Sequence, residues 1–185
     1  RLTMSMGSTI VYSAGELDVF LAKLDANTGN ALWLKSAGGP SSDEGTSLTL
    51  GSNKVFVAGM HAGMANFDAV TLNSYGLTDA FVACYNETTA NWTWAKTAGT
   101  PSIDQAWGIC TDGTNIFATG FYEGAVFNFG TTNLSGIGNV DGFVTKLDIN
   151  GNTAWSARIG AANQNESPTS IASDGQNVFV TGNAS

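Results

Sequence analysis

A three-residue pattern, Asp-x-Phe, recurs three times in this chain of 185 residues, at residues 18–20, 79–81 and 141–143. The copies are separated by 61 and then 62 residues, and each is followed by a tryptophan at the same phase: Trp33, Trp94 and Trp155. A period of this length is typical of stacked copies of one supersecondary unit. A residue that recurs at one phase is therefore explained first by the repeat, and only then by a unique active site.

Each copy is predicted to contain about four β-strands. Residues 20–24 and 31–35 flank one turn-rich segment, and residues 46–50 and 55–58 flank another. Strand-like runs bounded by glycine and asparagine are typical of antiparallel hairpins. We expect one further short strand in the variable segment before the next Asp-x-Phe, and no segment keeps an apolar period of 3.6 over ten residues. The sequence therefore predicts an all-β fold, and four antiparallel strands at a fixed interval are typical of a β-propeller blade.

Longer motifs recur with the same period. Text of the type D-A-F-V-A-K-L-D-x-N-G-N-x-x-W-x-K stands at 79–96 and, as far as its Trp, at 141–155. D-E-G-T-S-L stands at 43–48, N-V-F-V-T-G at 177–182, and a segment of the type F-G-x-x-x-L-x-S-x-G at 6–15. On these motifs the chain resembles the SBBP-type β-propeller repeats of secreted and surface-associated bacterial and archaeal proteins. The resemblance covers essentially the whole chain and implies a β-propeller-type repeat array. It implies no particular chemistry, because such repeats occur in many large proteins of undefined role.

The phase of the repeat divides the chain into four parts. If the strands of one copy are named a to d, starting at Thr46, their order along the chain is c-d, a-b-c-d, a-b-c-d, a-b. We expect complete blades at 37–97 and 98–158, and a third blade split between residues 1–36 and 159–185. Unpaired strand edges invite pairing with another chain. Three arrangements stay open: a six-bladed ring of two chains, a filament, or a fragment of a longer propeller. Our expectation is completion of the blade by a second copy.

Composition narrows the classes of partner. The formal charge is −8, and only 12 % of residues are charged. Nucleic acid demands a footprint of Lys and Arg, so this charge argues against nucleic acid, and likewise against anionic membrane surfaces. No apolar run approaches the roughly 18 residues of a membrane helix. With no signal peptide and no initiator methionine, the sequence is expected to be processed or excerpted. We expect an extracellular or cell-surface setting. This expectation rests on a surface rich in Ser, Thr and Asn and on the resemblance to SBBP-type repeats.

Two kinds of covalent modification are candidates. Asn-x-Ser/Thr sequons, the acceptors of N-glycosylation, occur at five positions: Asn86, Asn91, Asn133, Asn165 and Asn183. Cys84 and Cys110 both lie in the second copy, where they replace other residue types at their phases. A mutual disulfide and two buried free thiols are both open at this point.

No motif of a metal, cofactor or catalytic site stands out. The recurrent aspartates of Asp-x-Phe are predicted to cap loops by accepting backbone N–H groups, because catalytic carboxylate pairs need different environments. Asp25-x-Asn27 and residues 148–152 resemble fragments of calcium loops, but they lack the distal glutamate, so hairpin turns are favoured. His61 is the only histidine, which excludes a His-rich metal site. We therefore predict no cofactor, with calcium as the weaker alternative.

The residues that break the repeat form the candidate contact surface: His61, Trp92, Trp107 and Tyr122. Trp92 follows Asn91 in a predicted hairpin and is expected to be exposed, whereas the recurrent tryptophans are expected to pack between blades. The sequence thus predicts a non-catalytic extracellular structural or interaction protein that pairs with itself. A glycan- or protein-binding module, lectin-like or adhesin-like, is the alternative. An enzyme would need a non-equivalent carboxylate pair that the sequence does not reveal.

Overall fold

The computed structural model describes residues 3–185 as eighteen β-strands, and within these residues it contains no helix, so the all-β prediction is confirmed. The first nine strands are β1 (Thr3–Met6), β2 (Thr9–Tyr12), β3 (Val19–Leu24), β4 (Ala31–Ala37), β5 (Asp43–Gly51), β6 (Lys54–His61), β7 (Met64–Phe67), β8 (Val70–Asn73) and β9 (Asp79–Asn86). The others are β10 (Asn91–Gly99), β11 (Asp104–Thr111), β12 (Asn115–Tyr122), β13 (Val126–Phe129), β14 (Thr132–Ser135), β15 (Asp141–Asp148), β16 (Thr153–Ile159), β17 (Glu166–Ser173) and β18 (Val178–Ala184). None of the described segments is a helix able to cross a membrane.

Two groups of four antiparallel strands form the middle of the molecule. The first unit has the order β5-β6-β9-β10, and the second unit has the order β11-β12-β15-β16. The two middle strands pair in an equivalent register, since Gly59 lies opposite Phe81 in the first unit and Gly120 opposite Phe143 in the second. The first strands of successive units are also neighbours, because β11 contacts both β5 and β17.

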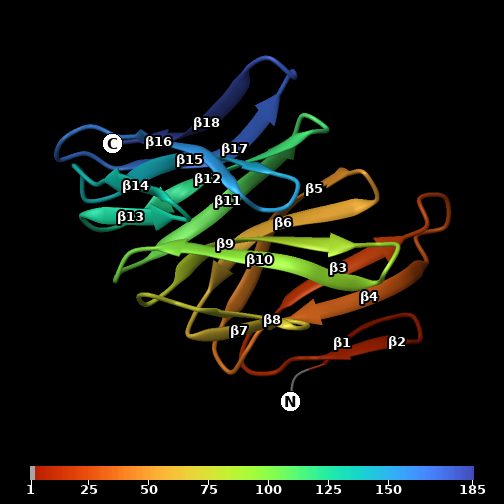
Figure 1. The fold of residues 1–185 in the computed structure, drawn as a ribbon. Coiled ribbons are helices and arrows are strands. Elements are labelled where there is room, and N and C mark those ends of the chain that lie inside the picture. Colours follow the sequence, from red (N-terminus) through yellow and green to blue (C-terminus); the bar gives the residue numbers. More distant parts are fainter. Residues whose placement is uncertain (1–2) are drawn as a thin grey trace.

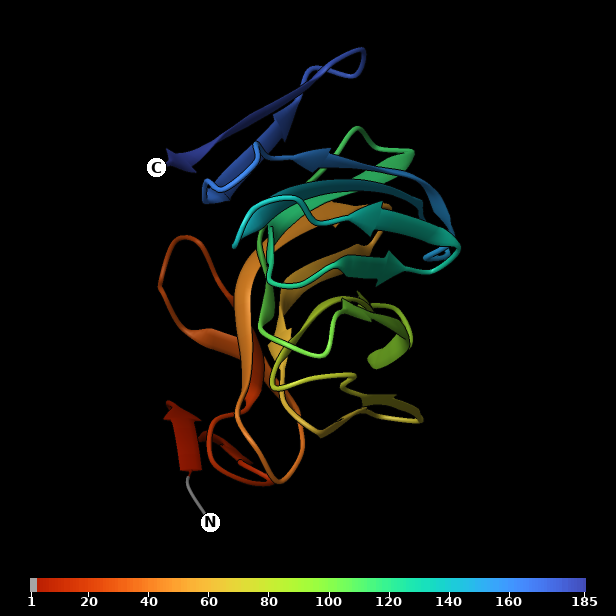
Figure 2. The ribbon, with the colours of Figure 1, turned by 90° about the vertical axis from the view of Figure 1, so that its left-hand side faces the viewer.

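Two-stranded sheets lie at the two ends of this arrangement. We call β3–β4 the amino-terminal half-sheet and β17–β18 the carboxy-terminal half-sheet. In both ribbon views the chain passes from the amino-terminal strands at the bottom to β17 and β18 at the top (Figure 1; Figure 2). Within the described residues, β3 pairs only with β4 and β18 pairs only with β17, so each half-sheet has an unpaired edge.

The variable segments form hairpins, which corrects the prediction of a single extra strand. The pairs are β1–β2, β7–β8 and β13–β14. The residues Gly7, Asp68 and Gly130 in their turns have positive φ values of 60°, 51° and 62°, which allow the chain to reverse tightly. Each reversal divides the variable segment into two short strands where the sequence predicts one. One hairpin joins the first unit, because Phe129 of β13 lies opposite Ala98 of β10.

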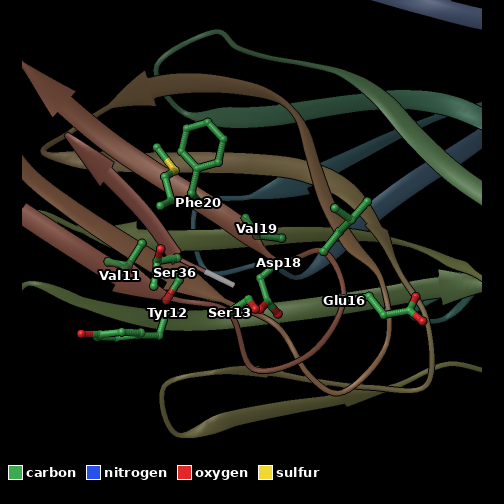
Figure 3. A pocket seen from close by; sticks show the side chains of 11 residues that line it. Val11, Tyr12, Ser13, Glu16, Asp18, Val19, Phe20 and Ser36 are labelled. Carbon is green, nitrogen blue, oxygen red and sulfur yellow. The ribbon is translucent and has the colours of Figure 1, made fainter. Parts of the chain in front are cut away.

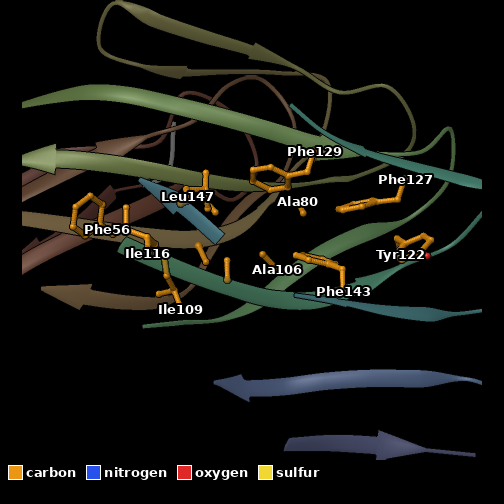
Figure 4. Packing of buried hydrophobic residues seen from close by; sticks show 14 of the residues in the cluster. Phe56, Ala80, Ala106, Ile109, Ile116, Tyr122, Phe127, Phe129, Phe143 and Leu147 are labelled. Carbon is orange, nitrogen blue, oxygen red and sulfur yellow. The ribbon is translucent and has the colours of Figure 1, made fainter. Parts of the chain in front are cut away.

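Apolar clusters fill the spaces between successive sheets. The largest includes Phe56 and Val82 of the first unit, Ile116 and Phe143 of the second unit, and Phe127 of the β13–β14 hairpin, as Figure 4 shows in part. A second cluster joins the amino-terminal half-sheet to the first unit, and a third joins the second unit to the carboxy-terminal half-sheet. Both faces of β6 and β9 are therefore buried. This is why these strands read as nearly continuous apolar runs rather than as alternating ones.

Two of the three recurrent tryptophans contact a neighbouring sheet, as the sequence predicts. The Nε1–H group of Trp94 donates to the carbonyl oxygen of Ile149 in the second unit at 3.2 Å. The ring of Trp33, in the amino-terminal half-sheet, lies 5.0 Å from the ring of Tyr85 in the first unit. Trp155 lies 6.3 Å from Phe117 of its own unit and stays partly exposed.

Candidate functional site

The unpaired edge of β3 carries a large exposed aromatic side chain. Phe20 occupies the same phase as Phe81 and Phe143. In the two complete units this phenylalanine is fully buried in the apolar cluster shared with the preceding sheet, whereas Phe20 is 56 % exposed. Leu24, at the other end of β3, is also exposed, although the residues at its phase, Tyr85 and Leu147, are buried. Within the described residues β3 has no preceding unit or half-sheet and no second paired strand, so the difference lies in the missing neighbours and not in the residue type.

The unpaired edge of β18 shows the complementary pattern. Phe179 is 59 % exposed, whereas Phe56 and Phe117 at the same phase are buried. These two side chains are covered by the sheet that follows their own unit. Within the described residues, β18 has no following sheet. Phe179 is therefore left open although it belongs to a phase that is buried elsewhere.

Cavities lie along both edges. One of about 170 Å³ is lined by Val11, Leu17, Val19 and Phe20, among others, and Figure 3 shows Phe20 and Val11 around it. A larger one of about 400 Å³ lies between β3 and β5, lined by Phe20, Leu24 and Leu48 among others. Both hollows are mainly apolar, and both border Phe20 on the unpaired strand β3.

A third cavity, of about 200 Å³, lies beside β18, between the carboxy-terminal half-sheet and β16 of the second unit. It is lined by Val180, Gly182 and Ala184 together with Ile159 and Pro168. A cavity therefore borders β18 as well as β3. Both unpaired edges of the molecule lie beside exposed apolar side chains.

The recurrent aspartates cap loops through hydrogen bonds, as the sequence predicts. The backbone N–H of Tyr75 donates to Asp79 Oδ2 at 2.8 Å, and that of Ile137 donates to Asp141 Oδ2 at 2.9 Å. Asp18 accepts in the same way from the N–H of Ala14. The phase and the chemistry of these three residues agree with a structural role.

A second recurrent carboxylate lies next to the first in two of the copies. Asp43 and Asp104 are fully buried at the start of β5 and β11, and each accepts a backbone N–H, from Gly39 at 2.7 Å and from Thr100 at 2.6 Å. Burial raises the pKa of Asp43 to about 6 and that of Asp104 to about 7. The nearby carboxylates of Asp18 and Asp79 add a smaller upward contribution to the respective pKa values.

The loop fragments that resemble calcium ligands are hydrogen-bonded turns. Asp25 Oδ1 accepts from the N–H groups of Asn27 and Thr28 at 3.0 and 2.8 Å, which helps to lower its pKa. Asp148 Oδ1 accepts from Asn150 and Asn152 at 2.8 and 2.9 Å. Across residues 3–185, no three or more His, Cys, Asp or Glu side chains are grouped as a metal site.

The four residues chosen as a contact surface do not form one. His61, Trp92 and Tyr122 are buried, so the expectation that Trp92 is exposed is wrong. The Trp92 ring packs against the β7–β8 hairpin, where it lies 5.1 Å from the Phe67 ring. The register of β9 and β10 shifts between Trp92 and Trp94. Trp107 alone is half exposed.

His61 is a buried, neutral side chain. Its Nε2 lies 2.8 Å from Thr97 Oγ1, and burial lowers its pKa to about 4. Trp107 donates from Nε1 to Gln105 Oε1 at 2.9 Å, beside an open depression of about 380 Å³ that Glu44 and Thr46 also line.

Both cysteines are free, which corrects the candidate disulfide. Cys84 belongs to the cluster between the first and second units, whereas Cys110 packs against the cluster between the second unit and the carboxy-terminal half-sheet. The two thiols thus lie on different sides of the second unit. The sequence could not reveal this, because both faces of these strands are apolar.

The sequons lie at the surface with one exception. Asn91, Asn133, Asn165 and Asn183 are exposed, and Asn86 is half-buried with its Oδ1 accepting the N–H of Thr88 at 2.8 Å. Glycosylation at these positions stays a prediction.

The chain matches no protein-family model, and a search of curated proteins finds no significant match. The functional residues must therefore be argued from the two open edges. The phase of the repeat predicts the unpaired edges. Phe20, Leu24 and Phe179 are not among the predicted site residues, although they stand on those edges at phases that are apolar in every copy.

Proposed function

We propose that this protein is a non-catalytic structural and interaction protein of the β-propeller type, and that another copy completes its split blade. The observation that carries the proposal is the pair of open edges, where Phe20 and Phe179 are exposed at phases that are buried within the complete units. In this assembly, each four-stranded unit is one blade and each half-sheet is half of a blade.

The packing of the sheets supports the propeller assignment. Four antiparallel strands per unit, apolar clusters between successive sheets, and neighbouring first strands β5, β11 and β17 are features of blades arranged about an axis. The resemblance of the motifs to SBBP-type repeats points the same way. A single chain supplies only three blades, fewer than the usual four to eight, whereas two chains supply six.

The energetics of the edges support completion by another chain. Covering an exposed phenylalanine or leucine stabilises a protein by roughly 1.5–3 kcal/mol. Sheet edges that stay free usually carry charges or proline, yet β18 contains neither. The one charge on β3, Lys23, is engaged with Glu87 Oε1 at 2.6 Å. Neither edge is well protected against pairing.

The proposed setting is extracellular or at the cell surface. It rests on the low content of charged residues, the exposed sequons and the family resemblance. In that setting an assembling propeller serves as a surface scaffold or filament subunit, and glycans or surface proteins are its further partners.

Sedimentation velocity over a range of concentrations, with electron microscopy of the same samples, tests the proposal. We expect either a closed species of two chains or longer filaments. A well-folded chain that stays monomeric at all concentrations would overturn assembly between copies. In that case, further residues of a longer polypeptide would be the source of the missing strands.

A glycan-binding module is the second candidate, and the depression beside Trp107 favours it. A half-exposed indole ring together with Gln105, Glu44 and Thr46 offers the stacking surface and the polar groups that bind sugars. A glycan array probed with the wild type and with Trp107→Ala tests this function. Binding that the substitution abolishes supports it, and an array with no binding rejects it.

A further inference from the structure

We infer that strand β18 of one copy pairs antiparallel with strand β3 of a second copy, in the register that places Gly182 opposite Phe20. This inference rests on the proposed function and deepens it, because it names the partner strands and the contacts of the junction. We use "junction" for the contact between the carboxy-terminal half-sheet of one copy and the amino-terminal half-sheet of the next.

The register follows from the two complete units. Their middle strands pair over eight consecutive positions, from Lys54 opposite Asn86 to His61 opposite Asp79 in the first unit. The second unit pairs over the same eight phases. Transferred to the half-sheets, the register runs from Asn177 opposite Asp25 to Ala184 opposite Asp18. A slip by one residue would turn every side chain of the strand to the wrong face.

Glycine at the phase of Gly182 leaves room for the phenylalanine that it faces. In the first unit, a Cβ added to Gly59 would come within 2.6 Å of the Phe81 ring. The β6–β9 pair therefore brings the ring against the glycine backbone. Gly182 keeps this feature on the open edge of β18, and Phe20 keeps the ring on the open edge of β3. The two edges of the molecule are complementary in the same way.

A second pair of exposed side chains is explained by the same junction. Phe56 and Ile109 share the apolar cluster between the two units, and Phe117 and Ile171 share the cluster that follows. The residues at these phases on the open ends are Phe179 and Leu48. Leu48 is 52 % exposed, whereas Ile109 and Ile171 are buried. When the junction forms, Phe179 of one copy also packs against Leu48 in the first unit of the next copy.

The junction joins two different surfaces, so it is heterologous. Each copy presents the β18 edge at one end and the β3 edge at the other, on opposite ends of the molecule (Figure 1). Such contacts form a ring where the rotation closes and a filament where it does not. They also allow the two edges to be blocked separately.

Two substitutions block one edge each. Phe20→Asp places a charge on the β3 edge, and Phe179→Asp places one on the surface that Phe179 offers to the next copy. Both side chains are exposed in the single chain, so the fold tolerates the change. Leu32→Asp is the matched control, because Leu32 is 57 % exposed and the residues at its phase, Thr93 and Ala154, are exposed in the complete units too.

The experiment compares these variants by sedimentation velocity, alone and mixed. We expect Phe20→Asp and Phe179→Asp to weaken association at least a hundredfold, and Leu32→Asp to assemble as the wild type does. An equimolar mixture of the two blocked variants keeps one intact pair of edges and should form a 1:1 dimer and nothing larger. Variants that assemble like the wild type, or a mixture that stays monomeric, would overturn the inference.

Amide hydrogen exchange provides a readout that needs no variant. In the assembled wild type, the backbone of both β3 and β18 should be protected, and dilution to the monomer should remove this protection. Assembly of the wild type without protection of these strands would leave the proposed function standing and reject the junction. A wild type that never assembles would reject the proposed function itself.

Discussion

Gly59 lies directly opposite Phe81 in the ladder of β6 and β9, and the space where a Cβ of Gly59 would stand is filled by the Phe81 ring and the carbonyl oxygen of Glu44. The same phase holds Gly120 in the second unit, against the carbonyl oxygen of Gln105. The middle of each unit thus depends on close approach of a strand to a glycine backbone.

Gly59→Ala should therefore destabilise the protein by about 2–4 kcal/mol, because neither the ring nor the backbone of β5 can move away without losing buried contacts. Urea denaturation followed by tryptophan fluorescence measures the effect. Gly51→Ala is the matched control, because its added Cβ would meet its nearest neighbour at an ordinary 3.6 Å. Equal losses for the two variants would contradict the steric explanation.

Asp104 should make stability depend on pH in an unusual direction. Its pKa is raised by burial from an ordinary value of 3.8 to about 7, so its contribution is fully present below pH 4 and is lost as the pH rises through 7. Asp43 acts in the same sense, with a pKa of about 6. His61 opposes both, because its lowered pKa of about 4 removes stability as the pH falls below 6.5.

The Asp104→Asn variant isolates this contribution from that of His61. Relative to the variant, the wild type should lose of the order of 2–4 kcal/mol of unfolding free energy between pH 4.5 and pH 8. Urea denaturation of both proteins at several pH values gives the difference. A difference that does not change with pH would show that the carboxyl group titrates normally in the folded state.

The strand order was predictable because glycine- and asparagine-rich turns recur at fixed phases. Other features depend on neighbours that one strand cannot reveal. Trp92 is buried because it packs against Phe67 of the β7–β8 hairpin, and no residue type at its own strand reveals that contact. Phe20 and Phe81 stand at the same phase with the same chemistry, yet only one of them has a strand beside it. The candidate site is therefore a property of the arrangement and not of a motif.

The two thiols should be reduced and slow to react in the native protein. Burial raises the pKa of Cys84, and burial, with a smaller effect of Asp112, raises that of Cys110 to about 11, so little thiolate exists at pH 8. Intact mass after iodoacetamide treatment should show almost no addition in buffer and two additions in denaturant without reductant. A single species that needs reductant for labelling would indicate a disulfide.

Trp92→Ala should cost about 3–5 kcal/mol of stability, as expected for removal of a buried tryptophan. The ring lies against Phe67 and, at 5.5 Å, Tyr85, and it helps to join the β7–β8 hairpin to the first unit. Trp155→Ala is the control, because this ring is partly exposed and contacts Phe117 at 6.3 Å. In urea denaturation, Trp155→Ala should lower the free energy of unfolding by less than half as much as Trp92→Ala. A milder effect at Trp92 than at Trp155 would mean that the inward rotation of the Trp92 ring is wrong, and that its hairpin exposes it as the sequence alone predicts.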